Sequence, residues 1–305
     1  MKTMLAGVAF IATIGTATAD TVPASSLQNI NGQYGAGTAT TTTDANGRST
    51  TVTGPGGGAN RATGTFAFNS WYQSNVGGGG TVGITSTYAR SGNGSVSFAT
   101  TSGDSKADLQ YYFGANGGYQ LNSLSSLTNL SYDFLRSGTS TVDRNLAPVF
   151  RLDIAKDGRA AGSLVFENVY QAQQAAPVDS WTTLSATLNS GIFWATNAAL
   201  GPAFADANGG QKTLQAWIDG NAGSTLSVYG MSMGVGSGWN GTFSGAEDNV
   251  AIAFSNGVNR SFNFETTAAT AAVPEPASWA MMILGIGMAG GVARYRRRKA
   301  TLTFA

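Results

Sequence analysis

The chain has 305 residues, 42 of them glycine, and it contains neither cysteine nor histidine. Charged residues make up only 11% of the chain, against about 25% in an average globular protein. This composition excludes disulfides, thiol nucleophiles, zinc–cysteine centres, Ser-His-Asp triads and histidine metal sites. Any metal would be held by oxygen ligands, which favours calcium or magnesium. The 42% hydrophobic content can still supply a core for one or two domains.

Residues 1–19 have the layout of a secretory signal peptide. Lys2 gives a positive start, and residues 5–14 form an apolar run broken only by Gly7 and Thr13. Ala17 and Ala19 supply the small residues that signal peptidase requires. We therefore predict signal peptidase and the secretion machinery as partners, with cleavage after Ala19.

Residues 20–65 are predicted to form a flexible or weakly β leader. From residue 31 onward the segment is dominated by Gly, Thr, Ala and Asn, including Thr40 to Thr43 and Gly56 to Gly58. Its few large apolar residues cannot offset the conformational entropy lost in a packed segment. A glycan-attachment region is the alternative interpretation, since threonine is so frequent.

Residues 66–265 are predicted to form one all-β domain, an antiparallel β-sandwich. Short runs of β-branched and aromatic residues recur every ten to fifteen residues between turn signals, and several alternate apolar and polar positions. One short helix is expected within residues 193–205, limited by Pro202. The expected strands cover residues 81–85, 95–98, 109–113, 130–135, 149–154, 163–170, 181–188, 214–218, 226–233, 250–254 and 261–264.

Two stretches of this region resemble jelly-roll carbohydrate-binding modules. Residues 84–98, which include Ala-Arg-Ser-Gly-Asn-Gly-Ser, are similar to an early hairpin of those modules. Residues 236–250, which end in Asp248-Asn249-Val250, are similar to their closing strand. The resemblance implies a jelly-roll-like fold. It does not transfer sugar-contacting residues, because the spacing of the aromatics is not reproduced.

The C-terminal segment has the pattern of a membrane anchor. After a linker over residues 266–273, residues 277–293 carry no charge, which is near the lower limit for a transmembrane helix. A basic cluster follows that should remain on the cytoplasmic side and stop translocation. It consists of Arg294, Arg296, Arg297, Arg298 and Lys299.

The residues before this helix resemble the PEP-CTERM sorting signal in its PEPxxWA variant. The motif is formed by Pro274, Glu275, Pro276, Trp279 and Ala280. The resemblance covers residues 274–305 and implies processing by exosortase, a membrane transpeptidase-like enzyme of Gram-negative bacteria that make exopolysaccharide. Prolines on both sides hold Glu275 in extended backbone, which leaves this segment accessible to an enzyme.

Aromatic side chains are the natural candidates for glycan binding, because their faces stack on the C–H surfaces of sugar rings. Trp181 and Trp217 lie in apolar runs and are expected in the core. The candidate platforms are Trp71, Tyr72, Tyr112, Trp194 and Trp239.

A structural calcium is a further prediction, with no other cofactor expected. Asp206 and Asn208 place oxygen ligands two residues apart before a glycine turn, and Asp248 resembles a position that helps to hold calcium in jelly rolls. The alternative is that Asp and Asn before glycine simply form turns.

An enzymatic function would have to rest on carboxylates, since glycoside hydrolysis needs two across the scissile bond. The candidates are Asp153, Glu167, Asp219, Glu247 and Glu265. No pair among them has a spacing typical of a catalytic dyad, so a non-catalytic protein is expected. A surface-associated glycan-processing enzyme remains the alternative.

Charge is segregated along the chain. Residues 20–276 keep 11 of the 17 basic residues against all 16 acidic ones, a net charge of −5. Nucleic-acid binding is therefore not expected. The sequence predicts a protein exported across the inner membrane of a Gram-negative bacterium, anchored transiently, and then released to the cell surface or extracellular matrix. Its expected role is structural, adhesive or glycan-binding, in exopolysaccharide or biofilm.

Overall fold

A computed structural model describes residues 19–27, 39–43, 49–53, 68–171, 175–201 and 210–267, together with Met288 and Arg294. The chain divides into two compact units, Met1–Ala268 and Ala269–Ala305. All of the strands described below belong to the first unit.

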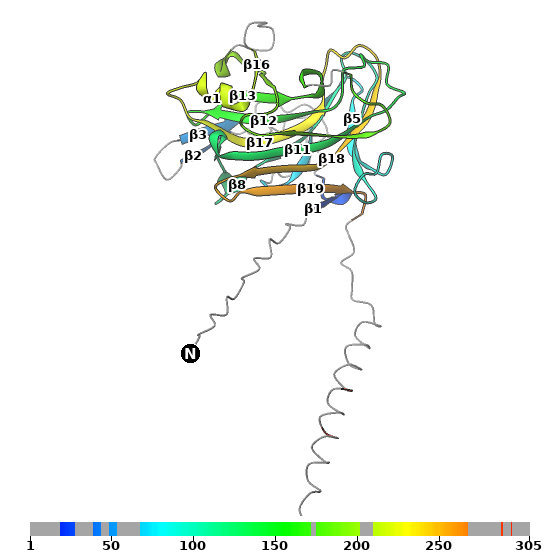
Figure 1. The fold of residues 1–305 in the computed structure, drawn as a ribbon, viewed down its shortest axis with the longest axis horizontal. Coiled ribbons are helices and arrows are strands. Elements are labelled where there is room, and N and C mark those ends of the chain that lie inside the picture. Colours follow the sequence, from blue (N-terminus) through cyan, green and yellow to red (C-terminus); the bar gives the residue numbers. More distant parts are fainter. Residues whose placement is uncertain are drawn as a thin grey trace, which may run out of the picture. The chain divides into compact units, whose positions relative to one another are not determined.

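The first unit is a sandwich of two β-sheets (Figure 1). A seven-stranded sheet has the order β1-β19-β18-β11-β14, with β6 beside β18 and β5 beside β6. Its strands are β1 (Asp20–Pro23), β5 (Thr81–Thr85), β6 (Ser95–Thr100), β11 (Leu127–Arg136), β14 (Trp181–Ala186), β18 (Phe243–Phe254) and β19 (Asn259–Glu265). The prediction of an all-β sandwich is confirmed.

The second sheet has ten strands, with the main order β16-β15-β13-β12-β17-β7-β4. These strands are β4 (Trp71–Gly77), β7 (Lys106–Tyr112), β12 (Val149–Lys156), β13 (Arg159–Phe166), β15 (Phe193–Ala195), β16 (Gln211–Lys212) and β17 (Leu226–Val235). At its margins β10 (Asn122–Ser123) pairs with β17, β3 (Ser49–Thr53) with β13, and β2 (Ala39–Thr43) with β3. A small hairpin of β8 (Gly114–Ala115) and β9 (Gly118–Tyr119) is separate.

Short turns fix the register of the central hairpin. Lys156 pairs with Arg159, so β12 and β13 are joined by the two residues Asp157 and Gly158. Both have positive φ angles, 51° and 79°, as the type I′ turn requires. The Asp-Gly turn therefore sets the pairing of Lys156 and Ala155, and a register shift between Ile154 and Ala155 separates it from the pairing of the rest of β12.

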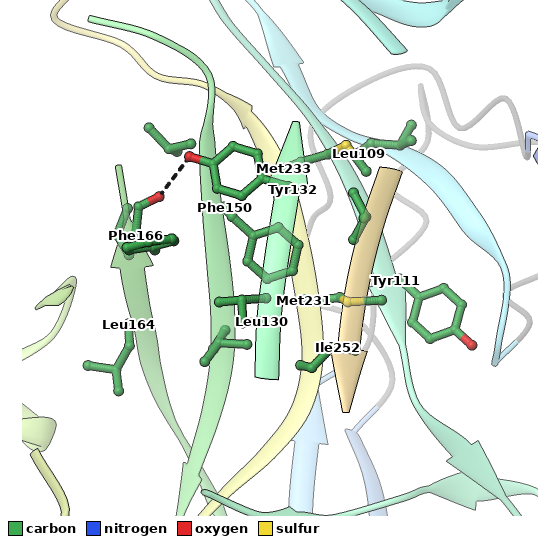
Figure 2. Close-up of a cluster of buried hydrophobic side chains, with 14 of the residues drawn as sticks. Leu109, Tyr111, Leu130, Tyr132, Phe150, Leu164, Phe166, Met231, Met233 and Ile252 are labelled. Carbon is green, nitrogen blue, oxygen red and sulfur yellow. Dashed lines mark hydrogen bonds between the residues drawn. The ribbon is translucent and has the colours of Figure 1, made fainter. Parts of the chain in front are cut away.

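The core lies between the two sheets and is rich in aromatic side chains (Figure 2). Tyr132 of β11 packs against Phe150 of β12 and Phe166 of β13, with ring centroids 5.8 and 6.1 Å apart. Its hydroxyl donates to the carbonyls of Phe166 and Pro148, each at 3.3 Å. The phenol is thus buried with its polar atom satisfied.

Several elements differ from the sequence-based expectation. The strand expected over residues 163–170 ends at Phe166, and residues 168–170 form a 3-10 helix. Residues 214–218 were expected to form a strand but form helix α1 (Leu214–Asp219), because Thr213 caps its N-terminus by accepting from the Ala216 N–H at 3.3 Å. Leu214 and Trp217, three residues apart, are buried on one helix face. Within the described part of residues 193–205 no α-helix forms where one was expected: β15 pairs with β13 and, through Phe193 and Trp194, with β16, and η4 (Ala198–Leu200) follows.

The segment expected to be a leader contributes to the sandwich. Asp20–Pro23 forms β1, in parallel with β19, and is followed by the 3-10 helix η1 (Ala24–Ser26). Val22 is buried in the core. The remaining 3-10 helices are η2 (Leu124–Ser126) and η3 (Asn168–Tyr170).

The predicted targeting segments lie largely outside the described residues. Of the signal peptide only Ala19 is described, and of the C-terminal segment only Met288 and Arg294. Within the described part of the chain, no helix has the length and apolar character needed to cross a bilayer.

Glu247 is an exception to the apolar core. Its neighbours in the adjacent strands are Phe134 and Val96, its side chain is 0% exposed, and neither carboxyl oxygen has a hydrogen-bond partner among the described residues. Burial raises the pKa of Glu247 well above its usual range, although the charge of Arg151 acts in the opposite direction. Burial therefore favours the protonated form of this carboxyl group and costs stability.

We predict that Glu247→Met stabilises the domain. Replacing an unpartnered buried polar group with an apolar side chain of similar volume should raise the free energy of unfolding by about 1–3 kcal/mol at pH 7. Chemical denaturation of the two proteins would measure it. The matched control is Asp133→Asn, a buried carboxylate that has hydrogen-bond partners and whose substitution should destabilise. A less stable Glu247→Met protein would contradict the prediction.

Candidate functional site

The main candidate site is a cleft of about 490 Å³ on the ten-stranded sheet. It is formed by residues from β4, β12, β13 and β15 and by the segments that follow β13 and β17. The side chains with the most distinctive chemistry in its lining are Asn75, Arg151, Glu167, Tyr170, Trp194 and Trp239.

Strand register places the cleft on the face of the sheet that points away from the core. Arg151 of β12 is aligned with Val165 of β13, which is aligned with Trp194 of β15. Side chains alternate between the two faces of a sheet, so Phe150 and Leu152 on either side of Arg151 enter the core. The three aligned residues therefore lie side by side on the outer face.

An ion pair lies beneath this cleft. Arg151 Nη1 donates to Asp108 Oδ1 at 2.9 Å, and the two side chains are only 17% and 12% exposed. Asn75 Nδ2 donates to the other oxygen of Asp108, also at 2.9 Å. Burial, the largest single effect, would lower the pKa of Arg151, but the charge and hydrogen bond of Asp108 together with the charges of Glu247 and Glu167 raise it. The guanidinium therefore remains charged.

The ion pair spans a whole strand, because Asp108 is on β7 and Arg151 is on β12, with β17 between them. Asp108 is aligned with Gly234 of β17. A Cβ atom at Gly234 would lie only 2.0 Å from Asp108 Oδ1. Glycine at this position leaves the space that the Asp108 carboxylate occupies.

Glu167 and Trp194 are joined in the same cleft. Trp194 Nε1 donates to Glu167 Oε1 at 2.8 Å. Burial raises the pKa of Glu167, while the bond from Trp194 and the charge of Arg151 lower it by less. Nearby, burial and the charge of Glu167 raise the pKa of Tyr170 to about 12, so its hydroxyl stays protonated.

Two of the five predicted aromatic platforms, Trp194 and Trp239, both line this cleft. Trp194 is partly exposed, whereas Trp239 is 9% exposed and packs edge-on against Phe243 at 5.3 Å.

The structure gives the other three predicted platforms different roles. Trp71 is 3% exposed and Tyr72 is 0% exposed, so neither can present a ring face to a sugar. Tyr112 is partly exposed but packs among aromatic rings, including Tyr72 at 5.8 Å and Tyr229 at 5.9 Å. The prediction that Trp71 and Tyr72 form platforms is wrong, because the sequence does not reveal which aromatics other elements cover. Tyr112 stays a prediction.

Arg151, Asn75 and Tyr170 were not predicted from the sequence. A usable signal was present in β17, where Gly230, Ser232 and Gly234 alternate with methionine. Small residues at every second position of a strand indicate that side chains of neighbouring strands cross it on that face. Their partners could not have been identified without the strand order.

Of the carboxylates considered for catalysis, only Glu167 lines the cleft, whereas Glu247 is buried in the core and acts electrostatically on the same Arg151. Asp153 accepts from Gln110 at 2.6 Å and Ser163 at 2.8 Å, and burial raises its pKa. Glu265 accepts from the Asn93 N–H and the Asn263 amide, and Asp219 accepts from Gln215 on helix α1. Glu167 is the one carboxylate among the described residues of the cleft lining.

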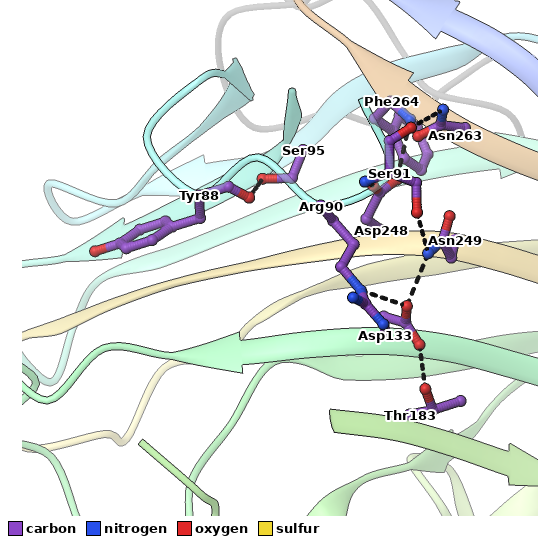
Figure 3. Close-up of polar contacts among 10 residues, drawn as sticks. All are labelled: Tyr88, Arg90, Ser91, Ser95, Asp133, Thr183, Asp248, Asn249, Asn263 and Phe264. Carbon is purple, nitrogen blue, oxygen red and sulfur yellow. Dashed lines mark hydrogen bonds and ion pairs between the residues drawn. The ribbon is translucent and has the colours of Figure 1, made fainter. Parts of the chain in front are cut away.

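Asp248, a predicted calcium ligand, belongs to a polar network between β18 and the loop before β6 (Figure 3). Its Oδ1 accepts from the Phe264 N–H at 3.0 Å and its Oδ2 from the Ser91 N–H at 3.4 Å. Asn249 Nδ2 bonds to Ser91 Oγ at 2.7 Å and to Asp133 Oδ2 at 2.8 Å. Protein donors thus engage both oxygens of Asp248, which makes it a poor fit to a calcium site.

The other predicted calcium ligands, Asp206 and Asn208, lie outside the described residues. Across the described parts of the chain, no three acidic side chains gather in a way that could hold a metal ion. A calcium site at residues 206–208 remains a prediction.

The sorting motif is supported by comparison with known families. Residues 272–298 match the family described as the PEP-CTERM protein-sorting motif. This match includes Pro274, Glu275, Pro276, Trp279 and Ala280 together with the basic residues up to Arg298, so the sorting tag predicted from the sequence is confirmed. Such a tag implies export, transit through a membrane-anchored stage, and processing by exosortase.

Solved structures resembling the chain include jelly-roll carbohydrate-binding modules. One is a family 11 module from Clostridium thermocellum in complex with a β-1,3-1,4-mixed-linked tetrasaccharide, with 13% identity, a TM-score of 0.34, and coverage of 58% of this chain and 86% of that chain. Another is the family 11 module of the C. thermocellum cellulosomal cellulase Lic26A-Cel5E, with 13% identity, a TM-score of 0.35, and coverage of 63% and 91%.

A glycoside hydrolase domain is also similar, Endo-D from Streptococcus pneumoniae R6, with 13% identity and a TM-score of 0.27 over 60% of this chain and 22% of that chain. These TM-scores are too low to carry a functional argument. No curated protein sequence matches the chain.

We predict that the domain is more stable at mildly acidic than at neutral pH. Burial raises the pKa of Asp248 to about 6, and it also raises the pKa values of Asp153, Glu167 and Glu247. The unfolded chain loses these protons first, so the free energy of unfolding should fall as the pH rises from about 4 to about 6, by roughly 3 kcal/mol for Asp248 alone, and the contribution of Asp248 should level off above that range.

Denaturant unfolding between pH 4 and pH 8 measures this slope. Asp248→Asn should flatten it, even if the variant is less stable overall because one acceptor is lost. A free energy of unfolding that increases from pH 5 to pH 7 would contradict the assignment.

Proposed function

We propose that the β-sandwich binds a glycan in the cleft lined by Trp194 and Trp239. The observation that carries this proposal is the presence of two tryptophans beside Arg151 and Glu167 in one cleft. Indole faces stack on the C–H surfaces of sugar rings, and charged side chains beside them bind hydroxyl groups.

The polar groups of the cleft suit hydroxyl recognition. Arg151 uses Nη1 for Asp108, and among the described residues its Nε and Nη2 make no hydrogen bond, so they can donate to a ligand. Glu167 uses Oε1 for Trp194, which leaves Oε2 as an acceptor. A donor and an acceptor in one cleft match the neighbouring hydroxyls of a sugar, each of which can both donate and accept.

The balance of charge favours a neutral polymer. Asp108 offsets the charge of Arg151 at 2.9 Å, and the part of the chain over residues 20–276 carries a net charge of −5. The cleft offers an acidic polysaccharide no positive charge that is not already paired, and the net negative charge of the domain would repel it.

The sorting tag and the cleft together support a role at the cell surface. An exported chain that exosortase processes is released where exopolysaccharide is made, and a glycan-binding domain would hold it there. We propose that the protein is an adhesive or structural component of the surface or matrix of a Gram-negative bacterium.

A glycan-processing enzyme is the competing function, and the cleft does not favour it. Hydrolysis by the usual mechanism needs a second carboxylate about 5–10 Å from the first, whereas Glu167 has none beside it among the described lining residues. Incubating the protein with the polymers that it binds, followed by reducing-sugar assay, separates the two functions. Turnover that is abolished by Glu167→Gln would overturn the binding proposal.

Substituting the cleft tryptophans should weaken binding. We predict that Trp194→Ala weakens affinity for a neutral polysaccharide at least tenfold, because it removes the partly exposed indole face, and that Trp239→Ala, whose ring is 9% exposed, weakens it less. Isothermal titration or affinity electrophoresis would measure the loss.

The matched control is Trp181→Ala. Trp181 is also partly exposed, but it lies on β14 in the other sheet, and its substitution should leave affinity unchanged. Equal losses in all three variants, with folded proteins by circular dichroism, would show that the cleft is not the binding site.

The sorting tag gives a separate prediction. Replacing Pro274, Glu275 and Pro276 together with alanine should block processing, so that the full-length chain accumulates in the inner membrane. Immunoblotting of membrane and surface fractions would detect the longer chain. If processing and surface delivery continue unchanged, the C-terminal segment acts only as an anchor.

A further inference from the structure

Strand β1 is held at the edge of the seven-stranded sheet by a single neighbour. Its four residues pair in parallel with β19, from Asp20 opposite Phe262 to Pro23 opposite Glu265. Among the described strands none pairs with its other side. Val22 is the only residue of β1 that is buried, at 9% exposed.

The surface that β1 covers is aromatic and incompletely filled. A cleft of about 450 Å³ lies between Val22 and Pro23 of β1 and the rings of Trp71, Tyr111 and Phe262. These rings pack together, with centroids of Trp71 and Tyr111 5.2 and 5.1 Å from that of Phe262. Trp71 Nε1 is buried and has no acceptor among the described residues. Because Val22 is the only buried residue of β1, the contact of β1 with the core is small.

The position of β1 in the chain would allow it to reach a neighbouring molecule. Cleavage at the predicted signal-peptidase site, directly before Asp20, would make β1 the N-terminal segment of the exported chain. On its other side, residues 28–38 separate it from β2. Eleven residues can span about 40 Å when extended, which is far enough for β1 to reach a neighbouring molecule.

We propose that β1 is exchanged between copies of this chain, so that residues 20–23 of one molecule occupy the edge of β19 in another. The occupant is a second copy because its strand has the same sequence and fits the same register and the same position for Val22. Exchange keeps every ladder hydrogen bond and the burial of Val22, so it costs little free energy.

The arrangement is directional. Each molecule donates one strand and accepts one, and a head-to-tail contact of this kind extends into a filament unless it closes into a ring. This inference goes beyond glycan binding, since it concerns a different sheet and does not require a ligand.

The absence of cysteine from the chain allows a direct test. Thr21 and Asn263 are register partners, so we would prepare full-length, exported Thr21→Cys and Asn263→Cys proteins of distinguishable mass, mix them in detergent, and oxidise them. Exchange predicts a disulfide-linked heterodimer, at a yield that increases with protein concentration. The double variant in one chain should form an internal disulfide, which verifies that the two positions meet.

The matched control is Thr81→Cys mixed with Ala99→Cys, a register pair within the adjacent strands β5 and β6 that should not exchange. A heterodimer yield from Thr21→Cys and Asn263→Cys no higher than from this control would overturn the proposal.

Val22→Asp provides a second readout. It should lower the heterodimer yield at least tenfold and shift light scattering toward monomer, because an aspartate cannot be buried at this edge. Polysaccharide affinity should remain unchanged, so a failure of strand exchange is distinguishable from a failure of the cleft. Unchanged light scattering and heterodimer yield in Val22→Asp would also contradict exchange.

Discussion

The ion pair between Arg151 and Asp108 connects the cleft to the sheet beneath it. Their side chains are mostly buried, and a guanidinium in such a place is stable only when an opposite charge and hydrogen bonds compensate for lost hydration. Asp108 supplies both, and Asn75 holds its second oxygen. Because the pair bridges β7 and β12 across β17, the glycine at position 234 is part of the same arrangement.

The core-facing side chains of the same strands hold Arg151 in position. Phe150 and Leu152 are buried on either side of Arg151, so any shift of β12 that moved the guanidinium would also disturb the core. Val165 and Trp194 follow in register on the next two strands. The cleft is thus built on paired strands, which keeps the cost of ordering its side chains on binding low.

The fold class was predictable from the sequence because its signals are local. Asp157-Gly158 specifies a two-residue hairpin turn, and alternation within residues 149–154 separates core from outer positions. Helix α1 was missed, since six residues of Leu-Gln-Ala-Trp-Ile-Asp are too few to show a helical period, and only the cap at Thr213 distinguishes them. The cleft was predictable only in part: Trp194 and Trp239 could be named, but Arg151 becomes meaningful only when β7 is known to lie two strands away.

The cleft and the exchanging edge lie on different sheets, so a molecule can use both at once. A single cleft with two tryptophans is expected to bind a polysaccharide weakly, because sugar hydroxyls are already well hydrated before they bind. Molecules joined through β1 would present many such clefts along one polymer chain, and each further contact would then form at a high effective concentration. Weak binding by each domain would thereby become firm retention by the assembly, which is what a matrix component requires. Val22→Asp should accordingly lower retention on a long polysaccharide while leaving affinity for a short oligosaccharide unchanged.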